Sequence, residues 1–139
     1  MNTSGPEVSK LDTQTKGDLA ELRIASAIRR QGHTILVPFT ESEQYDLAVD
    51  TGDRFIRVQV KYAKLQDNGT VKVSCLGTNS SKTGNNTTFY TEDQIDGIAC
   101  FCGDLERSFW VPFDEMNRYT FTLSEDGKHQ FDAYSIESI

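Results

Sequence analysis

The segment over residues 54–62 limits the possible folds most, because its side chains alternate between apolar and polar. One face would carry Ile56, Val58, Val60 and Tyr62, and the other Phe55, Arg57, Gln59 and Lys61. A period of two is typical of a β-strand, in which successive side chains point to opposite faces. We therefore expect a half-buried strand that holds Gln59 and Lys61 as neighbours on its polar face.

A shorter alternating segment over residues 45–50 precedes this strand, and the turn residues Thr51, Gly52 and Asp53 separate the two. Two such segments joined by a short turn predict a β-hairpin. Asp46 would lie on the polar face of the first strand. The hairpin would then bring a carboxylate close to the amide and the ammonium of the second strand.

A helix is expected over residues 16–31, with Thr15 as its N-cap and Gly32 at its end. Its apolar side chains recur at helical spacing, at Leu19, Leu22, Ala25 and Ile28. Glu21 shares a flank with residues that should face the sheet. A half-buried carboxylate in that position needs a partner.

The remaining segments predict further short strands over residues 34–39, 70–76, 95–102, 108–111, 119–123 and 131–136, and a helical turn over 113–118. Residues 77–88 are rich in Gly, Asn, Ser and Thr and predict a long polar loop, which is either functional or disordered. We expect a flexible leader over residues 1–15 and one domain over residues 16–139. The fold class should be α/β, with a mixed central β-sheet flanked by helices.

The four polar residues of the helix and hairpin suit phosphodiester hydrolysis. Mg²⁺ (or Mn²⁺) prefers oxygen ligands, often one or two carboxylates with water and a substrate phosphate. Glu21 and Asp46 can supply carboxylates and Gln59 an amide oxygen. Lys61 can hold the attacking water or neutralise developing negative charge. The alternative at each position is an ordinary solvent-exposed side chain.

These residues resemble the motif of the PD-(D/E)XK nuclease superfamily. The matching stretches are residues 16–21, Tyr45-Asp46-Leu47 and Gln59-Val60-Lys61. The string over residues 57–61 is similar to the Q-x-K branch of intron-encoded homing endonucleases, and archaeal Holliday-junction resolvases are a more distant likeness. Tyr45 stands where the family usually has Pro, and Gln59 where it usually has Glu.

The resemblance implies a restriction-endonuclease-like core and an endodeoxyribonuclease with Glu21, Asp46 and Gln59 at the metal and Lys61 as catalytic lysine. Because one such domain reaches one DNA strand, we also expect a homo-oligomer, either a dimer or a tetramer. A junction resolvase, a catalytically inactive module that binds DNA or protein, and a structural protein with a fortuitous motif are the alternatives.

The net charge of −7 is unusual for a protein that binds DNA, but the charge is unevenly distributed. Residues 1–91 carry a net of +1, and residues 92–139 a net of −8. The candidate DNA contacts are Arg54, Arg57, Lys64, Lys82 and Asn85, which are otherwise ordinary surface residues.

Two further features concern the environment of the protein. The N-terminal residues lack the apolar core of a signal peptide, and no stretch could cross a membrane, so we expect a cytoplasmic protein. The odd number of cysteines, three, argues against a disulfide framework and predicts reduced, buried thiols.

Overall fold

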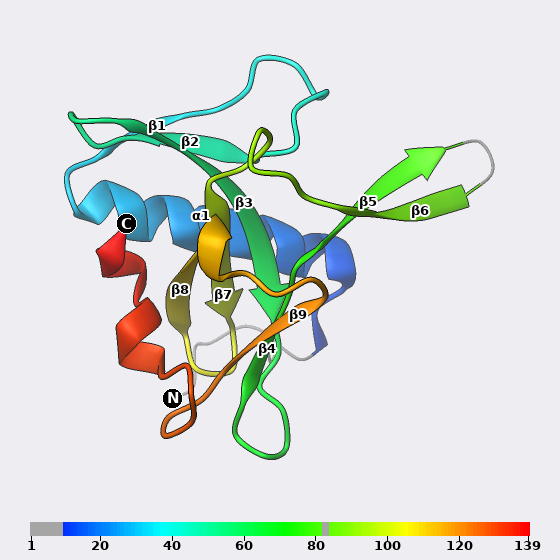
Figure 1. The fold of residues 1–139 in the computed structure, drawn as a ribbon, viewed down its shortest axis with the longest axis vertical. Coiled ribbons are helices and arrows are strands. Elements are labelled where there is room, and N and C mark those ends of the chain that lie inside the picture. The colour runs from blue at the N-terminus through cyan, green and yellow to red at the C-terminus, as the bar shows by residue number, and fades with distance from the viewer. Residues whose placement is uncertain (1–9, 82–83) are drawn as a thin grey trace, which may run out of the picture.

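The centre of the fold is a five-stranded mixed sheet in the order β1-β2-β3-β7-β8 (Figure 1). The computed structural model describes residues 10–81 and 84–139. The strands are β1 (Thr34–Leu36), β2 (Leu47–Asp50), β3 (Phe55–Ala63), β7 (Gly97–Cys102) and β8 (Arg107–Pro112). Strand β3 lies in the middle, antiparallel to β2 and parallel to β7. The hairpin expected from the alternating segments is therefore confirmed.

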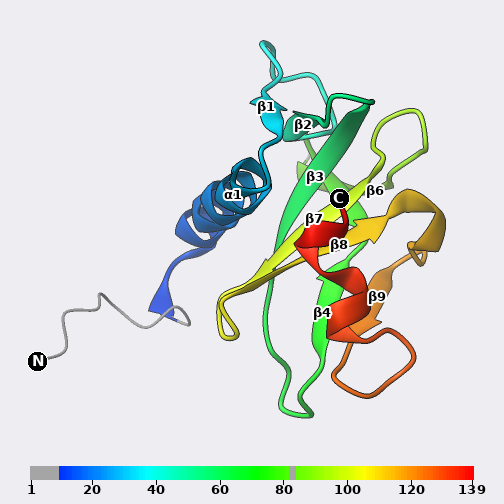
Figure 2. The same cartoon turned by 90° about the vertical axis from the view of Figure 1, so that its left-hand side faces the viewer.

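One face of the sheet is covered by the long helix α1 (Thr13–Arg30) (Figure 2). Its buried side chains Ala20, Ile24 and Ile28 pack on the apolar face of β3. The helix begins at Thr13, within the segment expected to be a flexible leader. The reason is its N-cap, which is Asp12 rather than Thr15: the Asp12 carboxylate accepts a hydrogen bond of 2.7 Å from the backbone N–H of Thr15.

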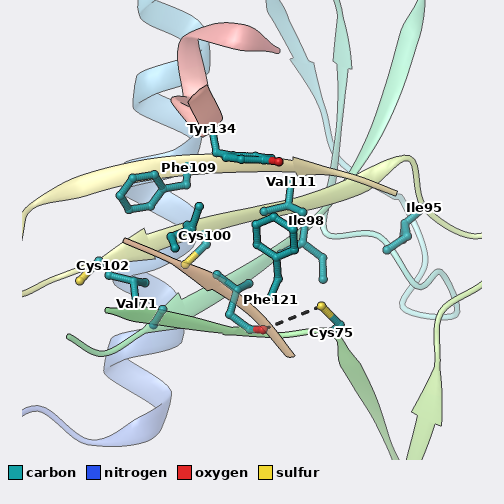
Figure 3. Close-up of a cluster of buried hydrophobic side chains, with 13 residues drawn as sticks. Val71, Cys75, Ile95, Ile98, Cys100, Cys102, Phe109, Val111, Phe121 and Tyr134 are labelled. Carbon is teal, nitrogen blue, oxygen red and sulfur yellow. Dashed lines mark hydrogen bonds between the residues drawn. The ribbon is translucent and has the colours of Figure 1, made fainter. Parts of the chain in front are cut away.

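The other face of the central sheet is covered by a second sheet instead of a helix. Strands β4 (Val71–Ser74) and β9 (Thr120–Leu123) pair antiparallel there. Phe121 of β9 belongs to a cluster of buried side chains between the two sheets. The central sheet contributes Ile98, Phe109 and Val111 to this cluster (Figure 3). The mixed α/β class is thus as expected, and the three cysteines are free and buried, as predicted.

The polar segment expected as a loop over residues 77–88 is instead a two-stranded ribbon, and that prediction was wrong. Strand β5 (Leu76–Ser81) pairs antiparallel with β6 (Gly84–Phe89), starting from the register pair Leu76 and Phe89. The paired backbones satisfy each other's hydrogen-bonding groups, so strands form here without an apolar pattern. The ribbon projects from the body of the molecule (Figure 1).

The C-terminal segment expected as a strand over residues 131–136 forms short 3₁₀ turns, η3 (Phe131–Tyr134) and η4 (Ile136–Ser138). Between them the backbone of Ser135 forms an isolated bridge to Phe109 of β8. The Ser135 hydroxyl accepts a bond from the N–H of Glu137, which favours a turn over continued extension. The helical turn expected over 113–118 is shorter, at η2 (Phe113–Glu115).

The two edges of the central sheet differ. The β8 edge is covered by the C-terminal turns, whereas β1 is the outer strand at the other edge. Beside β1, Val37 and Phe39 are exposed, with Phe39 fully so at 102%. In the part of the chain that the structure describes, no helix has the length and apolar character to span a bilayer.

Candidate active site

Asp46 lies one residue before β2 and connects that strand to β3 through both its backbone and its side chain. Its N–H donates to the carbonyl of Val58 at 2.9 Å, and its Oδ2 accepts from the N–H of Val60 at 2.8 Å. These two bonds fix the carboxylate beside Gln59 and Lys61. Burial raises the pKa of Asp46, although the bond from Val60 and the charge of Lys61 oppose that rise.

Glu21 reaches the same region from α1. It lines one pocket with Asp46, with a volume of about 390 Å³. The other lining residues are Asp18, Leu22, Ala25, Ile35, Val37 and Leu47. Burial raises the pKa of Glu21, and the negative charges of Asp46 and Asp18 add to the effect. The structure therefore brings the two expected carboxylates together in a setting that disfavours their charged forms.

Lys61 lies on the opposite face of β3 from the helix, where its side chain is held at the base of the ribbon. Its Nζ donates to the carbonyl of Leu76 at 2.7 Å and lies 5.3 Å from the centre of the Tyr90 ring. Burial lowers the pKa of Lys61, whereas the negative charge of Asp46 raises it. The ammonium is therefore desolvated and close enough to Asp46 for the two charges to interact.

Tyr90 also lies at the site, although it was not among the residues predicted there. Burial, followed by the negative charge of Asp46, raises its pKa to about 12. Its ring can cross β5 because Gly77 has no side chain: a Cβ there would lie 3.1 Å from two ring carbons. The signal that the sequence carries is the aromatic pair Phe89 and Tyr90 directly after a long polar segment.

Gln59 is placed beside Asp46 by the strand register, since Val58 is the partner of Leu47. Its Nε2 donates to the carbonyl of Val60 at 3.4 Å. That bond does not use the amide oxygen, which is the atom that a metal ion would need. Neither Gln59 nor Lys61 is among the residues that line the pocket of Glu21 and Asp46.

Arg57, expected to contact DNA, uses its guanidinium within the protein. It pairs with the Asp96 carboxylate at 3.1 Å and donates to the carbonyls of Glu92 and Asp93. The Asp96 carboxylate also accepts from the backbone N–H of Arg57 at 2.7 Å. These contacts favour a structural part for Arg57, namely tying the start of β7 to β3.

The other expected DNA contacts are distributed along β3 and the ribbon. Arg54 and Lys64 are exposed just outside the two ends of β3. The backbone of Asn85 pairs with Ser80 in the ribbon. Lys82 lies outside the described residues.

The donor atoms of the site fit a hard divalent cation. Across residues 10–81 and 84–139, no group of three or more His, Cys, Asp and Glu side chains could hold a metal ion. The site instead offers the carboxylates of Glu21 and Asp46, with the amide of Gln59 nearby. Two carboxylates are what Mg²⁺ commonly takes from a protein, with water and phosphate as the remaining ligands.

The central sheet is mixed, and a helix covers one of its faces. A carboxylate pair lies between this helix and the β2–β3 hairpin. These features define the class of restriction-endonuclease-like nuclease folds. A family model described as PD-(D/E)XK endonuclease matches residues 11–138. The chain therefore belongs to the PD-(D/E)XK endonuclease family.

A solved structure supports the same fold. A bacterial homing endonuclease, I-Ssp6803I, is similar to this chain with a TM-score of 0.74 and 22% sequence identity, covering 92% of this chain and 91% of that chain. At this identity the likeness concerns the fold alone. A search of curated protein sequences found no match.

Proposed function

We propose that this protein is a divalent-metal-dependent endonuclease that hydrolyses a DNA phosphodiester bond at Glu21, Asp46, Gln59 and Lys61. The observation that carries the proposal is the pairing of an exposed acid, Glu21, with the half-buried Asp46 in one pocket, with the half-buried ammonium of Lys61 next to Asp46. Perturbed pKa values grouped in this way are typical of catalytic sites. Membership in an endonuclease family gives the reaction class.

Each residue has a separate part in the reaction. Glu21 and Asp46 would hold Mg²⁺ or Mn²⁺, with Gln59 as a neutral oxygen donor. A divalent ion, when bound, supplies polarisation of the phosphate and acidification of a water molecule. Lys61 neutralises negative charge that develops on the phosphate, and its bond to Leu76 and the ring of Tyr90 keep the ammonium in place. The products would carry a 3′-hydroxyl and a 5′-phosphate.

The ribbon is the element best shaped to reach into DNA, because the major groove admits a two-stranded β-ribbon. Asn85 belongs to this ribbon, and Arg54 and Lys64 would contact phosphates just outside the two ends of β3. A homodimer or tetramer would place one active site on each strand.

The second candidate function is a catalytically inactive module that binds DNA or protein. Gln59 favours it, because the amide replaces the usual acid and does not line the carboxylate pocket. Both candidates are tested by incubating supercoiled plasmid with the native protein in MgCl₂ or MnCl₂. The endonuclease should produce nicked or linear DNA, and EDTA should stop it; intact plasmid under all conditions would favour the inactive module.

Asp46→Asn should abolish stabilisation by divalent ions while making the ion-free protein more stable. An acid whose pKa is raised by folding stabilises the fold while protonated, and this stability is lost as pH rises through the raised value. At neutral pH the ionised Asp46 is therefore destabilising, and its removal should raise Tm by a few degrees. Asparagine keeps the acceptor for the Val60 N–H.

The measurement is Tm by calorimetry with and without MgCl₂. The native chain should gain Tm with the ion, because a ligand that binds only the folded state stabilises it. Asp114→Asn, which removes an exposed acid elsewhere, is the matched control and should respond as the native chain does. An equal gain in Asp46→Asn would show that the ion binds at another place.

Binding of the divalent ion should weaken with acidification sooner than it would at ordinary carboxylates. Protons compete with the ion for the ionised acids. Because the pKa of both Glu21 and Asp46 is raised, chiefly by burial, protonation begins above the usual range of about 4. The gain in Tm from MgCl₂ should therefore decline between neutral pH and that range. A constant gain down to pH of about 4 would contradict the expectation.

A further inference from the structure

A cation outside the proposed catalytic set lies at the base of the ribbon, on the turn before β9. The guanidinium of Arg118 lies 4.0 Å from the centre of the Phe89 ring and 5.8 Å from that of Tyr119. The two rings meet edge to face, with 5.6 Å between their centroids. Both rings are partly exposed, at 42% for Phe89 and 56% for Tyr119. We refer to Phe89, Arg118 and Tyr119 as the aromatic ledge.

The aromatic ledge adjoins Lys61 through two short connections that meet at Leu76. The carbonyl of Leu76 accepts the bond from Lys61, and Leu76 pairs with Phe89 across the ribbon. Cys75, the residue before Leu76, donates its N–H to the carbonyl of Tyr119 at 2.8 Å. The turn before β9 and the base of the ribbon therefore lie side by side (Figure 1).

Consecutive residues at the end of β6 thus each hold a cation against a ring. Tyr90 holds Lys61, and Phe89 holds Arg118. The two cations differ in their surroundings, because Lys61 is half-buried while Arg118 is exposed. In the described part of the chain, the ion pairs within 4.0 Å do not include Arg118. Its charge is therefore available to an anion from solution.

We propose that Arg118, positioned by the ring of Phe89, binds a DNA phosphate next to the one that is cut at Lys61; the proposal rests on the endonuclease function above. A guanidinium suits this task because its planar donors match phosphate oxygens while its face stacks on an aromatic ring. Stacking holds the side chain in place before DNA arrives, so less freedom is lost on binding.

The test compares the affinity of the native chain and of Arg118→Ala for a fluorescent DNA duplex of mixed sequence, measured by anisotropy in EDTA over a series of salt concentrations. One phosphate contact changes the slope of log K against log salt by about 0.9. Kd should therefore rise about eightfold at ~0.1 M salt but only about threefold at ~0.3 M, if the contact contributes nothing at ~1 M. Arg118→Lys should retain the salt slope and lose part of the affinity.

Arg107→Ala is the matched control. Arg107 also stacks on two rings, those of Phe109 and Phe131, but the Asp132 carboxylate pairs with it at 2.5 Å. This variant removes the same charge from the molecule and should leave Kd and its salt slope unchanged. An equal loss in Arg107→Ala would mean that only net charge matters, and the proposal would fail.

A double-mutant cycle with Phe89→Leu tests the positioning part. In the native background Phe89→Leu should weaken binding, and in the Arg118→Ala background it should have no further effect. Additive losses would show that Phe89 contacts DNA by itself, which would overturn its positioning role. If native chain and Arg118→Ala bind equally, the phosphate contact is refuted while the endonuclease function stands; if the native chain neither binds nor cuts DNA, both fail.

Discussion

Lys61→Met should slow DNA cleavage about 100- to 1000-fold, the usual loss when one preorganised group that stabilises transition-state charge is removed. Methionine retains a long apolar stem that fills the space beside Tyr90 but carries no charge. The loss should appear in the rate of cleavage under saturating protein, with little change in Kd for DNA, because Lys61 is half-buried and bonded to Leu76. Single-turnover cleavage of a supercoiled plasmid in MgCl₂ is the measurement.

The control for this variant is Lys72→Met, which alters an exposed lysine on β4. It removes the same charge and should cut DNA at the native rate. Equal activity of Lys61→Met and the native chain would refute the proposed site, whatever nuclease activity the protein has. Loss of Tm in Lys61→Met alone would show instead that the bond to Leu76 supports the fold.

Phe121→Ala should destabilise the protein by about 3–5 kcal/mol, the usual cost of truncating a buried phenylalanine. Phe121 is fully buried between the two sheets, and its ring meets Tyr134 edge to face at 5.1 Å (Figure 3). A loss of this size is a large share of the roughly 5–15 kcal/mol by which domains are stable. The free energy of unfolding from urea titration is the measurement.

Phe55→Ala is the comparison for this prediction, because the Phe55 side chain is 66% exposed at the start of β3. It should cost under about 1 kcal/mol, as surface substitutions usually do. A small effect of Phe121→Ala would mean that the β4–β9 layer is loosely packed on the central sheet. Arg118 and Tyr119 of the aromatic ledge lie in the turn that leads into β9, so loosening of this layer should weaken DNA binding as well.

The sequence predicted the parts of this fold that depend on side-chain alternation and on helix periodicity. The hairpin of β2 and β3 was found because burial on one face of β3 requires apolar residues at every second position. The juxtaposition of Asp46 with Lys61 followed from that register. Glu21 was expected on a half-buried flank of the helix, but it is exposed there and reaches Asp46 from the helix surface. These features are local or connect neighbouring segments, which is why a single sequence reveals them.

The features that the sequence did not reveal depend on contacts between distant segments. The ribbon lacks an apolar pattern, because its strands are held by paired backbone groups. Tyr90 joins the site only because the ribbon brings its end against Lys61. Arg57 was expected to face DNA, but Asp96, which lies 39 positions away in the chain, binds its guanidinium in the fold. Alternation of apolar and polar residues predicts which side chains share a face of a strand. It does not predict which distant segment packs against that face.

The unequal edges of the central sheet bear on how copies of this protein could associate. Outer strands carry unpaired backbone groups that can recruit a strand from another chain. Turn η4 and Ser135 cover β8, so within the described part of the central sheet β1 is the outer strand open to such growth. Two copies that joined through β1 would leave no open outer strand in the joined central sheet. Association by this route would stop at a pair and would not continue into a fibre.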